Sequence, residues 1–286
     1  AQSGSFTPGV IVQPGDDWAA NGYSGNAVAV AGGFGDGQIQ ATGLTNQNEP
    51  LLIGRTNVAE GGARIVAYAT NEAGGSILIG QGVSGPAGYW RIQPDVPLPD
   101  GRYSIQIQAI DDASHVGSAV TTIATGLVVD TVGPRIVGVQ LQPGRGQVVV
   151  TYQDAGSGLD LDSVRNPASY SFSQQPSGPA PWTVTSVVAA PPFRTAPQRA
   201  TVVINGGRPI RGGSYLLTVR SAGGVRDRAG NPLQGGFDGR FPSRGAGDFN
   251  ALLTVVQGRA SRPRAAHPAF PGRFRPQAVL ASRAWK

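Results

Sequence analysis

A repeated alternation of residue types constrains the fold of this 286-residue chain more than any other feature. Residues 99–108 read PDGRYSIQIQ and residues 211–220 read RGGSYLLTVR, so each copy has a glycine turn, a tyrosine, and then apolar and polar residues in alternation. A period of two places every second side chain on the same face of a β-strand. Both copies therefore predict a strand with one buried face. Their spacing, about the size of one sandwich domain, predicts two such domains.

The rest of the chain also favours strands. Its 43 glycines and 23 prolines separate short runs of Val, Ile, Leu and Tyr, as turns separate strands. No segment of helical length keeps apolar residues at i, i+3, i+4 and i+7 without a glycine or proline between them. We expect an all-β fold in which Trp90 fills the space between two sheets, with one helical turn at residues 159–164. The expected strands are residues 51–56, 64–70, 76–81, 89–93, 103–110, 119–129, 136–141, 148–153, 170–173, 183–189, 200–205, 215–220 and 252–256.

The sequence divides into four segments. Residues 1–45 form a glycine-rich N-terminal segment or partial domain, and residues 46–133 form the first sandwich domain. Residues 134–258 form the second domain, and residues 259–286 form a basic Pro/Arg-rich tail that we expect to be disordered. The linker at residues 129–134, VDTVGP, is short and ends in proline, so the two domains should be coupled and not tumble freely.

Composition excludes several kinds of chemistry. The chain has no cysteine, which excludes disulfides, thiolate catalysis and zinc–cysteine sites. It also has no methionine, even at position 1, so we expect a processed or excised product; a removed signal peptide is one explanation for its first residues and would imply export. No run approaches the roughly 18 apolar residues of a membrane span, so we expect none.

The net charge of +6 comes from the tail. Seven basic residues and no acidic residue lie beyond Asp248, whereas the part up to Asp248 carries 16 basic and 17 acidic residues and is near neutral. A basic extension attracts nucleic acid, anionic lipid or acidic polysaccharide. The plainer interpretation of the tail, which has prolines at 263, 268, 271 and 276, is an extended, solvated segment. Of the three ligands, acidic polysaccharide is the one within reach of an exported protein, and nucleic acid is disfavoured.

Several short motifs occur in order along the chain. They are LLIGRT at 51–56, GYWRI at 88–92, PLPDGRY at 97–103, VDTVGP at 129–134, NPASY at 166–170, VRDRAGN at 225–231, FDGRF at 237–241 and GDF at 247–249. Those of the first domain resemble the bacterial immunoglobulin-like repeats of large surface adhesins, and those of the second resemble related modules of surface-layer and secreted proteins, including planctomycete-type exported proteins. The resemblance covers roughly residues 46–256.

The resemblance implies two tandem immunoglobulin-like β-sandwiches in an exported bacterial protein at the cell surface or outside the cell. Such modules serve adhesion, surface architecture or spacing, and their partners are other modules of the same assembly. Fold does not fix function, so this implication is an analogy. We expect a structural or adhesive module; the alternative is a carbohydrate-binding accessory module of a larger secreted enzyme, with Trp18, Tyr170 and Trp182 as a stacking platform if they are exposed and not in the core.

Calcium is a further implication, because some adhesin repeats bind it at domain junctions. A hard cation needs several oxygen ligands. Asp111 and Asp112 follow the predicted strand at residues 103–110, and Asp130 lies in the linker, which can share one end of the domain with that loop. These three are the candidate calcium ligands, although ordinary turn acids are the plainer interpretation. Asp154, or Asp160 with Asp162, would complete the site from the second domain.

Catalytic patterns are missing from the sequence. The two histidines, His115 and His267, are far apart, and no G-x-S-x-G motif occurs. A pair of carboxylates could still serve a glycosidase, but the acidic residues lie almost wholly in expected turns. We therefore expect no enzyme activity.

Overall fold

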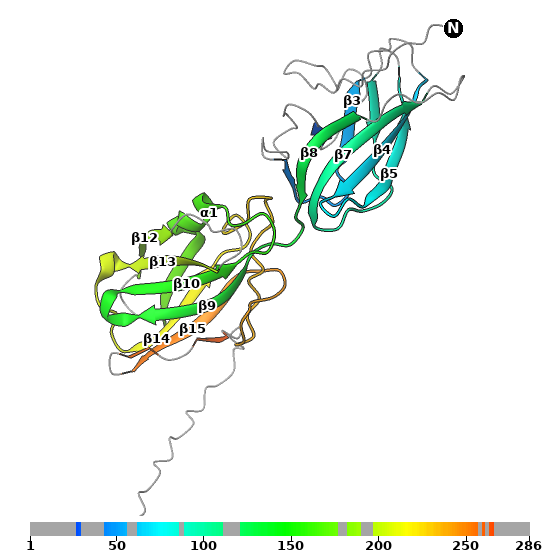
Figure 1. Cartoon of the computed structure of the whole chain (residues 1–286). Helices are drawn as coiled ribbons and strands as arrows, with labels where there is room; N and C mark the ends of the chain where they lie inside the picture. Colours follow the sequence, from blue (N-terminus) through cyan, green and yellow to red (C-terminus); the bar gives the residue numbers. More distant parts are fainter. Residues whose placement is uncertain are drawn as a thin grey trace, which may run out of the picture.

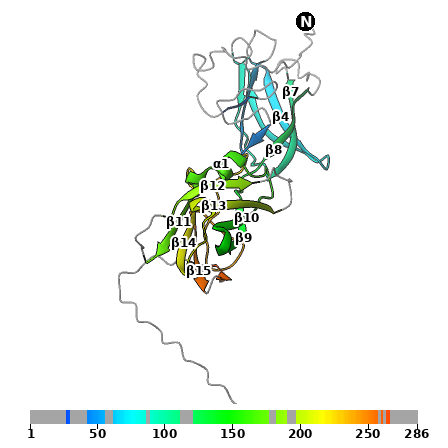
Figure 2. The same cartoon turned by 90° about the vertical axis from the view of Figure 1, so that its left-hand side faces the viewer.

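The computed structural model of the chain is mostly β-strand, arranged in stacked sheets (Figure 1). It describes residues 27–29, 43–55, 62–85, 89–110, 121–176, 182–189, 197–256, 259–260 and 263–265. Two separate hydrophobic cores divide these residues into a first unit and a second unit, joined by a short connection in Figures 1 and 2. The all-β sandwich prediction is confirmed at this level.

The first unit contains a five-stranded sheet in the order β2-β8-β7-β4-β5 and a three-stranded sheet in the order β1-β3-β6. Its core includes the fully buried Trp90, as the sequence predicts. The strands are β1 (Ala27–Ala29), β2 (Leu44–Thr45), β3 (Leu51–Arg55), β4 (Arg64–Asn71), β5 (Ser76–Val83), β6 (Tyr89–Ile92), β7 (Gly101–Ile110) and β8 (Thr121–Val129).

The second unit contains a four-stranded sheet in the order β12-β13-β10-β9 and a five-stranded sheet built on β11-β14-β15. Its strands are β9 (Arg135–Gln142), β10 (Gln147–Gln153), β11 (Tyr170–Gln175), β12 (Val184–Ala189), β13 (Gln198–Ile204), β14 (Gly213–Val219), β15 (Phe249–Val256), β16 (Arg259–Ala260) and β17 (Arg264–Ala265). The helical segments are η2 (Pro143–Arg145), α1 (Leu161–Arg165), η3 (Pro167–Ser169) and η4 (Asn205–Gly207).

The repeated motif occupies β7 in the first unit and β14 in the second. In both strands the alternation produces the expected faces, with the tyrosine and every second residue after it buried. The Tyr103 hydroxyl donates to the Pro99 carbonyl at 2.8 Å, and the Tyr215 hydroxyl donates to the Arg211 carbonyl at 3.0 Å. Each tyrosine therefore fastens the start of its own strand to the chain four residues upstream.

Most predicted strands appear within two or three residues of their expected bounds, because turn residues mark where the short apolar runs begin and end. The predicted helical turn is also present, as α1, whose first turn is capped by the Asp160 side chain. Among the residues that the structure describes, no helix is long and apolar enough to cross a membrane.

The segments outside the two predicted domains contribute strands to both units. β1 pairs in parallel with β3, and β2 pairs in parallel with β8, so part of residues 1–45 joins the first unit. β16 and β17 both pair with β15. The predicted disorder of the tail is therefore wrong for these four residues, because the edge of β15 offers backbone groups that a passing segment can pair with. Residues 266–286 lie outside the described part of the chain.

The two tyrosine hydroxyls should each stabilise their own unit. Tyr215→Phe removes the hydrogen bond to Arg211 and should lower the free energy of unfolding of the second unit by about 1 kcal/mol. Tyr103→Phe should have the same effect on the first unit. Urea unfolding measures both changes, with Tyr68→Phe on β4, outside either motif, as the control. Equal stability of Tyr215→Phe and the unsubstituted protein would contradict this role.

Candidate metal centre

The linker between the units is bonded to the first unit. The Asp130 backbone N–H donates to the Thr45 carbonyl at 2.9 Å. One carboxylate oxygen of Asp100 accepts both the backbone N–H and the hydroxyl of Thr131, at 3.0 and 2.8 Å. The first residues of the linker therefore have fixed positions on the first unit.

The same linker residues are bonded to the second unit. The Asn231 side-chain amide donates to the Asp130 carbonyl at 2.7 Å, and the Ser157 backbone N–H donates to the Asp130 carboxylate at 2.5 Å. Further along, Gly133 lies against the Pro232 carbonyl so closely that a Cβ on Gly133 would be 2.0 Å from that oxygen. Only glycine fits at this position, and the linker packs directly on the loop that contains Asn231.

Three aspartates meet where the linker enters the second unit. Asp130 comes from the linker, Asp154 follows β10, and Asp227 lies in the loop after β14. One carboxylate oxygen of each lies within 4.8 Å of those of the other two. Asp130 and Asp227 are each only 1% exposed. Oxygen atoms this close, on separate loops, can all reach one cation.

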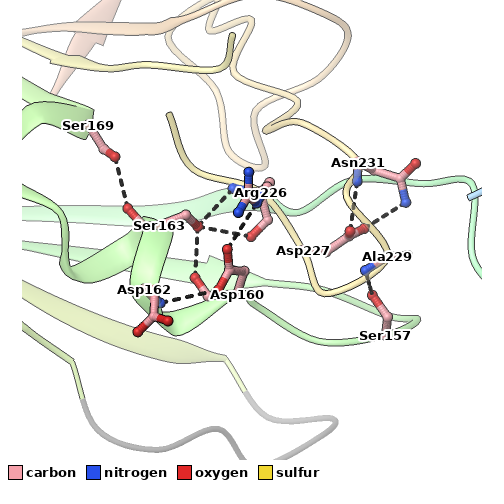
Figure 3. A network of polar contacts seen from close by, with 9 residues as sticks. All are labelled: Ser157, Asp160, Asp162, Ser163, Ser169, Arg226, Asp227, Ala229 and Asn231. Atoms are coloured by element: carbon pink, nitrogen blue, oxygen red, sulfur yellow. Dashed lines mark hydrogen bonds and ion pairs between the residues drawn. The ribbon is translucent and has the colours of Figure 1, made fainter. Parts of the chain in front are cut away.

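Backbone N–H groups fix the orientation of the carboxylates. One Asp154 oxygen accepts from the N–H groups of Gly156 at 3.0 Å and Gly158 at 2.7 Å. The two Asp227 oxygens accept from the backbone N–H of Asn231 at 2.8 Å and from its side-chain amide at 2.7 Å (Figure 3). The second Asp154 oxygen is buried and accepts no hydrogen bond. A buried carboxylate oxygen without a donor lacks a partner that a cation would supply.

The electrostatics of the cluster also favour a cation. Burial raises the pKa of Asp227 to about 7, and the charges of Asp130 and Asp154 add to the rise, while the hydrogen bonds from Asn231 oppose it. Burial likewise raises the pKa of Asp154, again with a contribution from Asp130. Ca²⁺ prefers several oxygen ligands, and three carboxylates converge at this point.

The structure brings some of the predicted metal ligands together and leaves others outside the cluster. Asp130 lies in the cluster, and so does Asp154, the residue expected to complete a site from the second domain. Asp160 instead caps α1 and forms an ion pair with Arg226 at 2.9 Å (Figure 3). Asp162, in the first turn of α1, is exposed and is not part of the cluster.

Asp111 and Asp112 lie outside the residues that the structure describes, so their part in a calcium site stays a prediction. Asp227 was not among the predicted ligands. A sequence motif nevertheless contains it, because Asp227 begins the D-R-A-G-N stretch. In the structure, the side chain of Asn231 in this stretch donates to both the Asp227 carboxylate and the Asp130 carbonyl of the linker.

Two members of the predicted aromatic platform pack inward. Tyr170 is 4% exposed, and its hydroxyl lies 2.9 Å from the Tyr152 hydroxyl. Trp182 is half-buried, with its ring packed edge-on against Phe172 and Tyr215. Trp18 lies outside the described part of the chain. Tyr170 and Trp182 therefore belong to the packing of the second unit and not to a flat exposed surface.

Comparison with known proteins adds no relative. No protein-family model matches the chain, and no curated protein matches it significantly.

Calcium should bind at the three aspartates. Calorimetric titration of chelator-treated protein should show one site that Asp154→Asn or Asp227→Asn weakens at least about tenfold, because each change removes a negative charge and a ligand oxygen. Asp95→Asn, which neutralises an exposed aspartate outside the cluster, should leave binding unchanged. A heat signal that survives both cluster substitutions would place the ion elsewhere.

The metal-free protein should lose stability as the pH rises from 5 to 8. An unfolded aspartate has a pKa of about 3.9, whereas the pKa of Asp227 in the fold is about 7. Between these values the folded state holds a proton that the unfolded state has released, so the free energy of unfolding falls with pH and levels off above about 7. The melting temperature in chelator should follow this course.

Asp227→Asn should remove much of that pH dependence, since the group that titrates is then absent. Saturating calcium should also remove it, because the ion favours the ionised carboxylates. A melting temperature that rises over this pH range, or falls equally in the variant, would contradict the assignment.

Proposed function

We propose that this chain is a non-enzymatic structural or adhesive module of an exported bacterial surface protein, and that it spaces or mediates attachment at the cell surface. In this proposal the two units are tandem immunoglobulin-like sandwiches. The pair of tyrosines bonded four residues upstream supports it, because a tyrosine near the start of a strand that bonds back to the chain is typical of that fold.

One observation carries the proposal: the linker is bonded to both units. A module that holds a binding domain away from the cell surface must keep the orientation of one domain fixed relative to the next. The Asp130 backbone N–H donates to Thr45 of the first unit. The Asp130 carboxylate accepts from Ser157, and its carbonyl accepts from Asn231, both of the second unit. A linker with such contacts is far stiffer than a flexible polar connection.

The burial of the aspartates supports a structural role over a hydrolytic one. Catalytic carboxylates must contact the bond that they cleave. Asp130 and Asp227 are each 1% exposed, so a substrate cannot reach them in this arrangement. A cation bound there joins the linker to two loops of the second unit instead.

The alternative, a carbohydrate-binding accessory module, has less support. It depends on exposed aromatic rings that stack on sugars, and Tyr170 and Trp182 pack into the second unit. We therefore prefer the structural module.

The coupling can be measured by distance distributions between spin labels. The chain has no cysteine, so labels can be placed without background at Ser76→Cys on β5 and Ser173→Cys on β11, both of which replace exposed residues. With calcium the distribution should be narrow, and with chelator it should broaden. Asp130→Ala should keep it broad even with calcium, because the linker then loses its side-chain bond to Ser157 and its ligand oxygen.

A label pair within the second unit, Ser173→Cys with Ser186→Cys, is the control and should not respond to calcium. A distribution between the units that is equally broad with calcium and with chelator would overturn the proposed coupling.

A further inference from the structure

The near-neutral charge of the chain up to Asp248 hides two oppositely charged units. Residues 46–133 contain eight acidic and four basic residues, whereas residues 134–258 contain twelve arginines and six aspartates. The excess of acidic residues in the first range and the excess of arginines in the second nearly cancel in the net charge. The second unit is therefore strongly basic independently of the tail.

The six aspartates of the second unit gather at the end near the linker. Asp154 and Asp227 belong to the cluster beside Asp130, and Asp160 and Asp162 lie at the start of α1. Asp248 precedes β15 and accepts from the backbone N–H of Ser221, just after β14 ends. The remaining one is Asp238, in the loop that runs from Gln234, which pairs with Arg135 at the start of β9, to the start of β15.

The opposite end of the unit holds arginines. β9 leaves the linker and ends at η2, and β13 runs antiparallel to β10, so η2 and η4 both lie at the end away from the linker. Arg145 belongs to η2, and Arg208 and Arg211 follow η4; all three side chains are exposed. We call Arg145, Arg208 and Arg211 the arginine tip.

Backbone contacts hold the turns of the arginine tip together. The Ile204 N–H donates to the Gly146 carbonyl at 2.8 Å, and the Ile210 N–H donates to the Pro143 carbonyl at 2.8 Å. A Cβ on Gly146 would lie 2.4 Å from the Arg208 carbonyl oxygen, so the two turns are in direct contact. The backbone of Arg259, on β16, pairs with Val256 at the same end of the unit.

The arginine tip has no opposing charge. No acidic residue occurs in residues 143–146, 174–176, 182–184 or 204–213, which form the described turns and strand ends at this end of the unit. Among the described residues, no carboxylate forms an ion pair with any of the three arginines. Like charges held close together on rigid turns repel one another, and an anionic ligand relieves that repulsion.

We propose that the arginine tip is a docking surface for an acidic polysaccharide. A guanidinium group presents a planar fork of donors that matches a carboxylate or a sulfate. The turns that carry the three arginines are rich in glycine and contain no aromatic side chain. Trp182, at the same end of the unit, is half-buried, with its ring packed against Phe172 and Tyr215. Single-stranded nucleic acid is usually held by aromatic rings that stack on its bases, so the chemistry of the arginine tip fits a charged sugar polymer better.

This inference deepens the proposed function and rests on it for the choice of a surface polymer as the ligand. The two can fail separately. Calcium-dependent coupling is measured at the junction without any polymer, and polymer binding is measured at the arginine tip without reference to calcium.

The test uses the full chain and polygalacturonate as the probe. Replacing Arg145, Arg208 and Arg211 by glutamine should weaken binding at low salt about tenfold, because three exposed ion pairs of ordinary strength add up to that factor. The matched control replaces three exposed arginines nearer the linker end, Arg199, Arg220 and Arg244, by glutamine and removes the same charge. This control should bind within about twofold of the unsubstituted protein.

Arginine footprinting separates the arginine tip from the basic tail. Bound polygalacturonate should protect Arg145, Arg208 and Arg211 from phenylglyoxal but leave Arg199, Arg220 and Arg244 reactive. Equal weakening in both triple variants, or protection confined to the tail, would overturn the proposal. Tighter, tip-dependent binding of an oligothymidylate of equal charge would overturn it too, in favour of nucleic acid.

Discussion

The burial of the Asp130 carboxylate is the constraint on which the arrangement of the linker depends. A carboxylate that is 1% exposed must be hydrogen-bonded or paired, and Asp130 has one short bond to Ser157 and two acidic neighbours. Its backbone is at the same time bonded to Thr45 and to Asn231. Both units therefore form hydrogen bonds with a residue that has two acidic neighbours, and a cation bound to the three carboxylates would replace their repulsion by attraction.

The strands and their faces could be predicted because they follow from local periodicity. Every second residue after Tyr103 and after Tyr215 is buried, as the alternation requires. Asp130 and Asp154 could also be named, because β10 runs antiparallel to β9, the first strand after the linker, and therefore ends beside the linker. Asp227 was missed because the D-R-A-G-N stretch marks a loop but does not show that this loop folds back on Gly133, which is a long-range contact.

The position of the charges in the fold likewise could not be predicted from the sequence alone. A net charge summed along the chain indicates a neutral body with a basic tail, which is correct as a sum. The structure adds position: the aspartates of the second unit lie near the linker, and Arg145, Arg208 and Arg211 lie at the far end. The charges of the second unit are thus separated along its length, with an acidic end near the linker and a basic end away from it.

The central claim is that one cation joins the linker to the second unit at Asp130, Asp154 and Asp227. Anomalous X-ray diffraction from crystals soaked with terbium, a substitute for calcium, tests it most directly. The account predicts one strong anomalous peak about 2.3–2.6 Å from an oxygen of each of the three aspartates. Ordered crystals with no peak there, or with terbium bound only at exposed carboxylates such as Asp95 or Asp162, would contradict it.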